Sequence, residues 1–494
     1  MRFRAAMLIA MASLGRAGEV RPHPCEVRGV PGQALCATLP VWENRETRSG
    51  RRIELNIVIL PALNKDHAAD PLFLLHGGPG GAATALAPAY ARHPLRERRD
   101  IVMIDQRGTG GSHPLPCDFF GDPPDLQRVV TSQFPVEQVR ACREQLERIA
   151  DLTQYTTAIA MDDIDEARQW LGYAKVNLWG GSYGSLAAQV YLRRHEASVR
   201  AVVLEGVLPA DELAVLHHAS AGQRAIDILF EKCRADARCN GTYPHLREDF
   251  AAMFQRVREG AEVVVHDSGG RSARVRPGVE ALAEGIRHRL YGDTGNALAG
   301  MIHRAAAGDL GPIVQAAVDA QLALDGQLAT GLLLSVSCAE HIPYITDEMA
   351  ARETAGTFLG DLRIREQQAA CAQWVRGQVP ADVHTPVRSN VPVLLISGYR
   401  DPVTPPSFAE RVAKQLPNSL QVVFPEASHG VAGECERSLM TEFIERGSVQ
   451  GLDTSCVTAW KPGFPMVAAA AGLVVVALVI WMQRRRSRSY LIHN

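Results

Sequence analysis

The residues whose types and spacing suit chemistry begin with a serine set between glycines. The stretch Val176–Ser185 reads VNLWGGSYGS, a short apolar run that meets the pattern G-x-S-x-G at Ser182. A helical pattern from Ser185 to Arg194 follows at once. A strand, a sharp turn and a helix in this order present a serine hydroxyl for nucleophilic attack. Gly180 and Gly184 suit the turn because they have no side chains to crowd it. We therefore predict that Ser182 is a nucleophile.

A serine nucleophile needs a base and an acid that orients the base. Val391 to Ser397 and Leu420 to Phe424 are predicted buried strands, and Asp401 and His429 each lie in a turn just past one of them. The carboxyl ends of parallel strands share one edge of a sheet, so both side chains are expected beside Ser182. The chain order Ser, Asp, His is one of the known orders of a catalytic triad.

Acyl transfer also needs backbone N–H groups that stabilise an oxyanion. The N–H of Tyr183, directly after the serine, is one predicted donor. The segment 76–81 reads HGGPGG after another apolar run, and its glycines allow close approach of the backbone. We predict Gly78 as the second donor, with Gly77 as the alternative. His76 has no visible partners for a metal and is interpreted as structural.

The elements that must position these residues alternate between strand and helix. Two further ranges, Val136–Ala150 and Ala158–Leu171, have helical periodicity. This alternation predicts an α/β fold with a mostly parallel sheet covered on both faces. The predicted strands before Pro209 are Arg52–Leu60 (as an edge strand), Pro71–Leu75, Ile101–Ile104, the run into Ser182, and Val199–Leu204.

After Pro209 the pattern changes to helical stretches with few strand signals, until strands resume near residue 391. We interpret the intervening segment as a helical cap inserted on the sheet, since Pro/Ser-rich linkers that would mark a separate domain are missing from the sequence. The predicted organisation is a signal peptide (1–18), a first part of the core (40–209), the cap (210–380), a second part of the core (381–460), a transmembrane helix (464–482) and a basic tail (483–494).

Composition narrows the function classes. The 494 residues carry a formal net charge of -2, with 46% hydrophobic and 21% charged residues, which is typical of a globular protein. This charge gives no sign of a nucleic-acid surface. No cysteine pair forms C-x-x-C, so structural zinc and thioredoxin-like chemistry have little support. We expect no cofactor and no metal.

The ten cysteines fall into successive near neighbours along the chain, which suggests five local disulfides; buried free thiols are the alternative. Disulfides form in oxidising compartments. The expected pairs are Cys25–Cys36, Cys117–Cys142, Cys233–Cys239, Cys338–Cys371 and Cys435–Cys456.

Both chain ends agree with export. A basic head at residues 1–4, an apolar stretch at 5–14 and a small-residue site at 15–17 resemble a secretory signal. Residues 464–482 carry no charge and suit a membrane crossing, and the arginines at 484–488 favour the cytoplasmic side. We expect a periplasmic or extracellular catalytic part anchored in the inner membrane, although a terminal sorting signal that is later removed has the same pattern.

Taken together, these motifs resemble the proline iminopeptidase and tripeptidyl aminopeptidase family of α/β-hydrolases, over most of the chain from Leu55 to Cys456. The resemblance implies an α/β-hydrolase fold, a triad of Ser182, Asp401 and His429, and cleavage of N-terminal residues from peptides. The cysteine pairs are similar to those of secreted bacterial members. The motifs that carry the resemblance are HGGPGG at 76–81, DQRGTGGS at 105–112, GGSYG at 180–184, DPVTP at 401–405 and SHG at 428–430.

An aminopeptidase must recognise a free ammonium group, for which a carboxylate in the pocket is the simplest partner. We predict Glu340, in the cap, and Glu205, just past a strand end, as the substrate-binding acids. Peptides with a free N-terminus are the expected substrates. Two alternatives remain at this point: a carboxylesterase or lipase with the same machinery, and a non-catalytic binding protein on a hydrolase fold.

Overall fold

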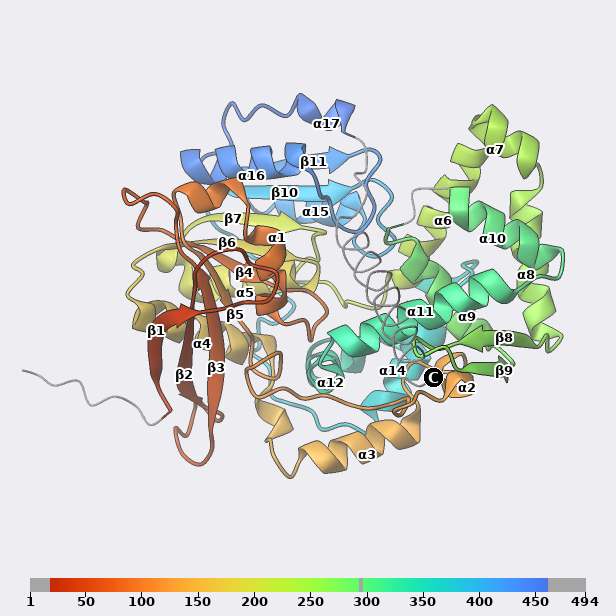
Figure 1. Ribbon diagram of the computed structural model, residues 1–494, viewed down its shortest axis with the longest axis horizontal. Helices are drawn as coiled ribbons and strands as arrows, with labels where there is room; N and C mark the ends of the chain where they lie inside the picture. Colours follow the sequence, from red (N-terminus) through yellow and green to blue (C-terminus); the bar gives the residue numbers. More distant parts are fainter. Residues whose placement is uncertain (1–17, 293–295, 461–494) are drawn as a thin grey trace, which may run out of the picture.

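The computed structural model describes residues 18–292 and 296–460, and its centre is a nine-stranded sheet (Figure 1). The strand order is β1-β2-β3-β5-β4-β6-β7-β10-β11. The strands from β5 to β11 in this order run parallel, while β1, β2 and β3 join antiparallel, as β3 does to β5. The strands are β1 (Val20–Cys25), β2 (Ala34–Trp42), β3 (Arg52–Leu60), β4 (Leu72–Leu75), β5 (Ile101–Ile104), β6 (Val176–Gly181), β7 (Val199–Glu205), β10 (Val393–Gly398) and β11 (Ser419–Phe424).

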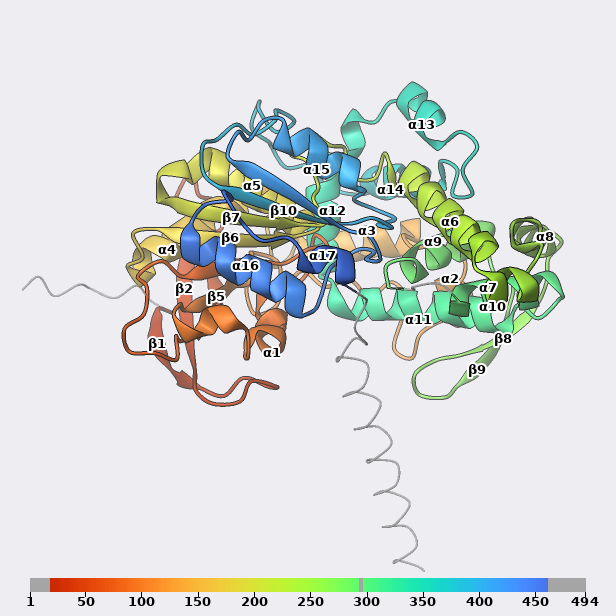
Figure 2. The same ribbon diagram turned by 90° about the horizontal axis from the view of Figure 1, so that it is seen from above.

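The parallel strands are apolar on both faces, as a sheet covered by helices requires. In β4, Phe73 and Leu75 join one buried cluster while Leu72 and Leu74 join another. The first cluster includes helices α3 (Val136–Leu146), α4 (Thr157–Leu171), α5 (Tyr183–His195) and α15 (Pro406–Ala413), and the second includes α1 (Ala87–Tyr90), α16 (Glu434–Arg446) and α17 (Cys456–Ala459). Figure 2 shows α5 and α16 on opposite sides of the strands. The predicted α/β architecture with a mostly parallel sheet is confirmed.

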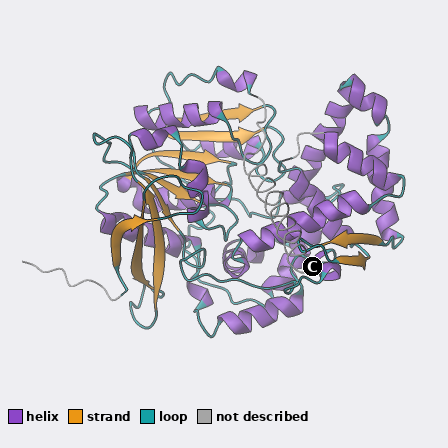
Figure 3. Cartoon of the chain, in the orientation of Figure 1, coloured by secondary structure: helices purple, strands orange, loops and turns teal. Residues whose placement is uncertain are grey.

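The segment between β7 and β10 forms a largely helical second part beside the carboxyl ends of the parallel strands (Figures 1 and 3). It also holds an antiparallel hairpin, β8 (Val263–His266) and β9 (Ser272–Val275), which the sequence did not predict. Helix α2 (Leu126–Val129) contacts this hairpin. The helices of the segment are α6 (His218–Ala235), α7 (Ala237–Thr242), α8 (Leu246–Arg258), α9 (Val279–Arg289), α10 (Asn296–Ala306), α11 (Gly311–Gln327), α12 (Thr330–Glu340), α13 (Asp347–Thr354) and α14 (Leu362–Cys371).

Two details of the predicted sheet are wrong. The strand Arg52–Leu60 has the predicted bounds but is not an edge strand, because β3 pairs with β2 on one side and β5 on the other. The sheet also begins before residue 40, since β1 and β2 both belong to it. β1 has the sequence VRPHPC and is almost wholly exposed, so it lacks the apolar alternation that identifies a strand.

All five predicted disulfides are confirmed, and the described chain contains no free cysteine. The Cys338–Cys371 bond joins α12 to α14, and the Cys435–Cys456 bond joins α16 to α17. Disulfides in every pair are typical of an exported protein.

Within residues 18–292 and 296–460, no helix combines the length and apolar character needed to cross a bilayer. The predicted transmembrane helix (464–482) and basic tail (483–494) lie outside the described residues, as does the predicted signal peptide apart from Gly18.

Candidate functional site

The position of Ser182 follows from the tight turn between β6 and α5. Ser182 has φ 56° and ψ -125°, one of the few positive φ values at a non-glycine residue in the described chain. The turn holds because its neighbours are small: a Cβ on Gly184 would lie 2.0 Å from the backbone oxygen of Leu75. The strained backbone aims the side chain out of the sheet edge, the geometry that the G-x-S-x-G pattern predicted.

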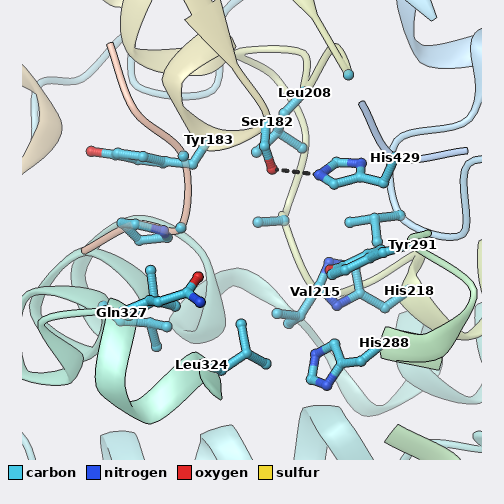
Figure 4. Close-up of a pocket in the computed structure, with 18 of the residues that line it drawn as sticks. Ser182, Tyr183, Leu208, Val215, His218, His288, Tyr291, Leu324, Gln327 and His429 are labelled. Carbon is cyan, nitrogen blue, oxygen red and sulfur yellow. Dashed lines mark hydrogen bonds between the residues drawn. The ribbon is translucent and has the colours of Figure 1, made fainter. Parts of the chain in front are cut away.

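The structure brings Ser182, His429 and Asp401 together in one hydrogen-bonded row. Figure 4 shows the hydrogen bond between Ser182 and His429. His429 Nε2 lies 3.0 Å from Ser182 Oγ, and His429 Nδ1 lies 2.8 Å from Asp401 Oδ2. An ionised carboxylate only accepts hydrogen bonds, so Nδ1 carries the proton and Nε2 is free to accept from the serine hydroxyl. Both residues lie just past strand ends, β10 for Asp401 and β11 for His429.

Asp401 is held rigidly. It is fully buried, and its Oδ1 accepts the N–H groups of Val403 and Thr404, each at 2.8 Å. The Thr404 hydroxyl donates to Asp401 Oδ2 at 2.7 Å and lies 3.2 Å from His429 Nδ1. Sequence reasoning missed Thr404, although the turn DPVT itself carries the signal, since a threonine three residues after an acid can bond back to it.

The electrostatics of His429 favour its protonated form. Burial lowers the pKa of His429, but the charge and hydrogen bond of Asp401, together with the charge of Glu205, outweigh it and raise the pKa above its ordinary value. The ring of Tyr291, just past the end of α9, stacks on His429 with centroids 4.8 Å apart (Figure 4). Sequence reasoning also missed Tyr291, and no local pattern around it indicates a place in the site.

The predicted oxyanion donors lie next to Ser182. Tyr183 is the first residue of α5, and the first N–H groups of a helix have no acceptor within it. Of the two glycines weighed for the second donor, Gly77 lies against the serine: a Cβ there would be 3.0 Å from Ser182 Cβ. A Cβ on Gly78 would instead meet the N atoms of Gly80 and Gly81, and Gly78 has φ 122°. Both glycines line the same cavity as Ser182.

The two predicted substrate-binding acids have different surroundings. Glu340, 3% exposed, directs its carboxylate at Thr157 at the start of α4, accepting the Thr157 N–H at 2.6 Å and its hydroxyl at 2.7 Å. The residues that line the cavity do not include Glu340. Burial raises the pKa of Glu340 to about 7. The structure therefore does not bring Glu340 to the cavity, because both of its oxygens brace α4.

Glu205, at the end of β7, does line the cavity. Its backbone oxygen accepts the N–H of Ser182 at 2.9 Å. Its side chain accepts the N–H of Val431, two residues past His429, at 2.6 Å, and the indole N–H of Trp179 at 3.3 Å. Burial raises the pKa of Glu205. Glu205 thus connects the turn of the serine to the loop of the histidine.

The cavity has a volume of about 470 Å³ and lies between the catalytic edge of the sheet and helices α6, α9, α11, α12 and α14. This size is within the usual range for a small-molecule or peptide side-chain pocket. Besides Glu205, its lining contains one other acid, Asp325 on α11, which the sequence did not single out. Burial and the charge of Asp118 raise the pKa of Asp325 to about 6. Among the described residues, no group of three or more metal-ligating side chains is arranged to hold an ion.

Comparison with known proteins gives two family matches. The model described as the alpha/beta hydrolase fold matches residues 70–230, and the model described as TAP-like protein matches residues 356–456. The serine protease Hip1 of Mycobacterium tuberculosis is 23% identical over 86% of this chain and 88% of its own length. The proline iminopeptidase of Neisseria gonorrhoeae is 30% identical over 28% of this chain and 32% of its own length, and that of Arabidopsis thaliana is 30% identical over 39% and 37%.

Each of the two family matches contains part of the hydrogen-bonded row of Ser182, His429 and Asp401. The alpha/beta hydrolase match contains Ser182, and the TAP-like match contains Asp401 and His429. With matches to the alpha/beta hydrolase fold and the TAP-like model, peptidases among its relatives and a serine on a nucleophile turn, the chain is a serine hydrolase of the peptidase type.

Proposed function

We propose that this protein is an aminopeptidase that releases N-terminal residues from peptides, with Ser182 as nucleophile, His429 as general base and Asp401 as the acid that orients it. The observation that carries the proposal is the row Asp401–His429–Ser182, with distances of 2.8 and 3.0 Å, at the wall of an enclosed cavity.

In this mechanism neutral His429 takes the proton of Ser182 as Oγ attacks the scissile carbonyl. Asp401 holds the tautomer with Nδ1–H and stabilises the imidazolium that forms. His429 then donates the proton to the leaving amine, and water releases the acyl group by the reverse sequence. The N–H of Tyr183 and an N–H of the turn at Gly77 and Gly78 serve as oxyanion donors, each worth roughly 10²–10³ in rate.

The exopeptidase part of the proposal requires a carboxylate for the free ammonium group. Glu205 and Asp325 are the acids that line the cavity. Glu205 is already engaged with Val431 and Trp179, whereas Asp325 has no ion pair among the described residues. We therefore infer that Asp325 is the principal partner of the ammonium, in place of Glu340, with Glu205 nearer the reacting carbonyl.

The first test is the nucleophile. Ser182→Ala should reduce kcat by roughly 10⁶-fold on aminoacyl or tripeptidyl anilides and abolish labelling by a fluorophosphonate probe. The midpoint of thermal unfolding should change little, because only one hydroxyl at the cavity wall is lost. Undiminished labelling in Ser182→Ala would assign the nucleophile elsewhere, and an unlabelled wild-type protein would favour a non-catalytic binding role.

The second test concerns the free N-terminus. Wild type should cleave anilides with a free α-amine at least about tenfold faster in kcat/KM than their N-acetyl partners. Asp325→Asn should reduce that preference, whereas Asp319→Asn, an exposed acid on the same helix, should keep it. Equal cleavage of both partners would indicate an endopeptidase, and cleavage of p-nitrophenyl esters alone would indicate a carboxylesterase.

We also propose that the protein is exported and remains anchored by residues 464–482, with its catalytic part in the periplasm or outside the cell. The five disulfides support export. The anchor rests on the uncharged sequence of that segment and the arginines after it.

A further inference from the structure

One wall of the catalytic cavity is basic. Arg287 and His288 from α9, Arg363 from α14 and His218 from α6 all line it. Burial and the charges of the arginines lower the pKa of both histidines, that of His288 to about 3, so the two arginines supply the positive charge. In Figure 4, His218 and His288 lie on the side of His429 and Tyr291, while Leu324 and Gln327 of α11 lie on the other side. The lining acids, Glu205 and Asp325, come from other elements, β7 and α11. The cavity therefore has a basic wall with no acid of its own in the lining.

Arg287 is held in this wall by hydrogen bonds to Glu284 and Tyr291. Its guanidinium donates to Glu284 Oε2 at 2.7 and 2.9 Å and to the Tyr291 hydroxyl at 2.9 Å. Burial alone would raise the pKa of Glu284, but the charges of Arg287 and Arg363 lower it to about 2. Glu284 is thus ionised and neutralises one of the two arginines around it.

Arg363 is the second arginine, and unlike Arg287 it forms no direct ion pair with a described carboxylate. The charges of Glu284 and Glu366 favour its charged form, but burial outweighs them and lowers the pKa of Arg363. Its buried Nε–H has no acceptor among the described residues, and its guanidinium lies over the ring of Phe134, 4.9 Å from the centroid. A guanidinium that is partly withdrawn from water without a directly paired carboxylate is unfavourable, and an anion in the cavity would relieve that cost.

Neutral polar groups on the same wall also lack partners. Gln367 of α14 is 1% exposed and Gln133 is 7% exposed, and neither Oε1 accepts a hydrogen bond from a described residue. Both line the cavity. Buried amide oxygens of this kind are normally satisfied, so they indicate a site for N–H donors of a ligand. A cation beside two amide acceptors suits a short piece of peptide that carries a carboxylate.

We propose that Arg363 in this basic wall binds a carboxylate of the peptide substrate while Gln133 and Gln367 accept N–H groups of the same substrate, so that the enzyme prefers substrates with an anionic group at that end. The inference rests on the proposed peptidase function and specifies its substrate class. Two sources supply the same chemistry: an Asp or Glu side chain, and the C-terminal carboxylate of a short peptide.

The test uses short peptides in matched pairs, with cleavage followed by chromatography. One set exchanges Glu for Gln at each of the first three positions, and the other exchanges a C-terminal acid for its amide. Wild type should prefer the carboxylate member of one set by about tenfold or more in kcat/KM, and the set that shows it identifies the source. Arg363→Gln should reduce that preference to within about twofold and change cleavage of the neutral member by less than about threefold.

The matched control is Arg365→Gln, which removes an exposed arginine of the same helix that pairs with Asp361. It should behave as wild type, and Arg363→Lys should keep part of the preference. The proposal is overturned if wild type shows no preference in either set, or if Arg363→Gln slows both members of a pair equally. If Arg363→Gln does not fold, the preference of wild type between the carboxylate and neutral members of each pair still tests the proposal. If wild type is labelled by fluorophosphonate but cleaves no peptide, the peptidase function fails, and the same pairs built as esters test the wall separately.

Discussion

At the scale of single residues, the triad depends on a carboxylate outside it. Glu205 accepts the N–H of Ser182 through its backbone and the N–H of Val431 through its side chain, so it sets the relative positions of the nucleophile and the base. Its charge also contributes to the raised pKa of His429. Glutamine at this position removes the charge and keeps one acceptor oxygen for the N–H of Val431, while its NH2 group replaces the oxygen that accepts from the Trp179 indole.

We expect Glu205→Gln to move the acid limb of the pH profile of kcat/KM to lower pH. Activity requires neutral His429 and so appears as pH rises through the pKa of that residue. Removing a negative charge lowers this pKa, so activity appears at lower pH. Glu434→Gln, an exposed acid at the start of α16, is the control and should leave the profile unchanged. An acid limb that stays in place, or moves to higher pH, would mean that Glu205 acts only through its hydrogen bonds.

At the scale of elements, the sequence predicted the strands that carry the chemistry, together with β3, and missed β1, β2, β8 and β9. Strands β4 to β7, β10 and β11 are short and largely apolar runs, so their pattern is visible in the sequence. β1 is exposed and β8 and β9 are four residues each, too short for a clear period. Tyr291, Asp325 and Arg363 reach the cavity through packing of α9, α11 and α14, which no local pattern encodes.

Glu340 shows how a residue prediction fails at this scale. It lies two residues after the disulfide-bonded Cys338, and its side chain points to α4 rather than into the cavity. The Thr157 hydroxyl that it binds also lies 2.8 Å from the Tyr183 hydroxyl. Glu340 therefore stabilises the junction of α12, α4 and α5 behind the nucleophile turn.

We expect Glu340→Gln to change the pH dependence of stability. The folded-state pKa of about 7 lies above the ordinary value, so the folded protein holds this proton more tightly than the unfolded chain. That contribution is present at low pH and is lost as pH rises from about 4.5 to about 7, a change of roughly 3 kcal/mol. The variant resembles the protonated acid at every pH.

The free energy of unfolding, measured by denaturant titration, should therefore favour Glu340→Gln over wild type increasingly between pH 5 and pH 8. A difference that is constant with pH would contradict this account. The variant should also change kcat/KM equally for peptides with free and acetylated N-termini. A loss confined to free amines would return Glu340 to substrate binding.

At the scale of the whole molecule, the last described residues are fixed to the sheet and to α16. The Cys435–Cys456 disulfide fixes α17 to α16, and Trp460 packs against Phe424 with ring centroids 5.4 Å apart. The Trp460 indole N–H also donates to the backbone oxygen of Ala432 at 3.2 Å. These contacts hold the last described helix and Trp460 against β11 and α16.

A chain truncated after Trp460 tests the proposal that residues 464–482 anchor the protein in the membrane. In the proposed topology the segment 464–482 crosses the bilayer and the arginines after it stay in the cytoplasm, so full-length protein should sediment with membranes. Protease added to intact spheroplasts should then digest its catalytic part. The truncated chain should remain in the supernatant after ultracentrifugation, with kcat/KM within about twofold of the full-length value. Full-length Ser182→Ala is the control for localisation without activity and should sediment as wild type does. Full-length protein that stays in the supernatant, or that is protected from protease in spheroplasts, would reject the anchored topology while leaving the catalytic proposal intact.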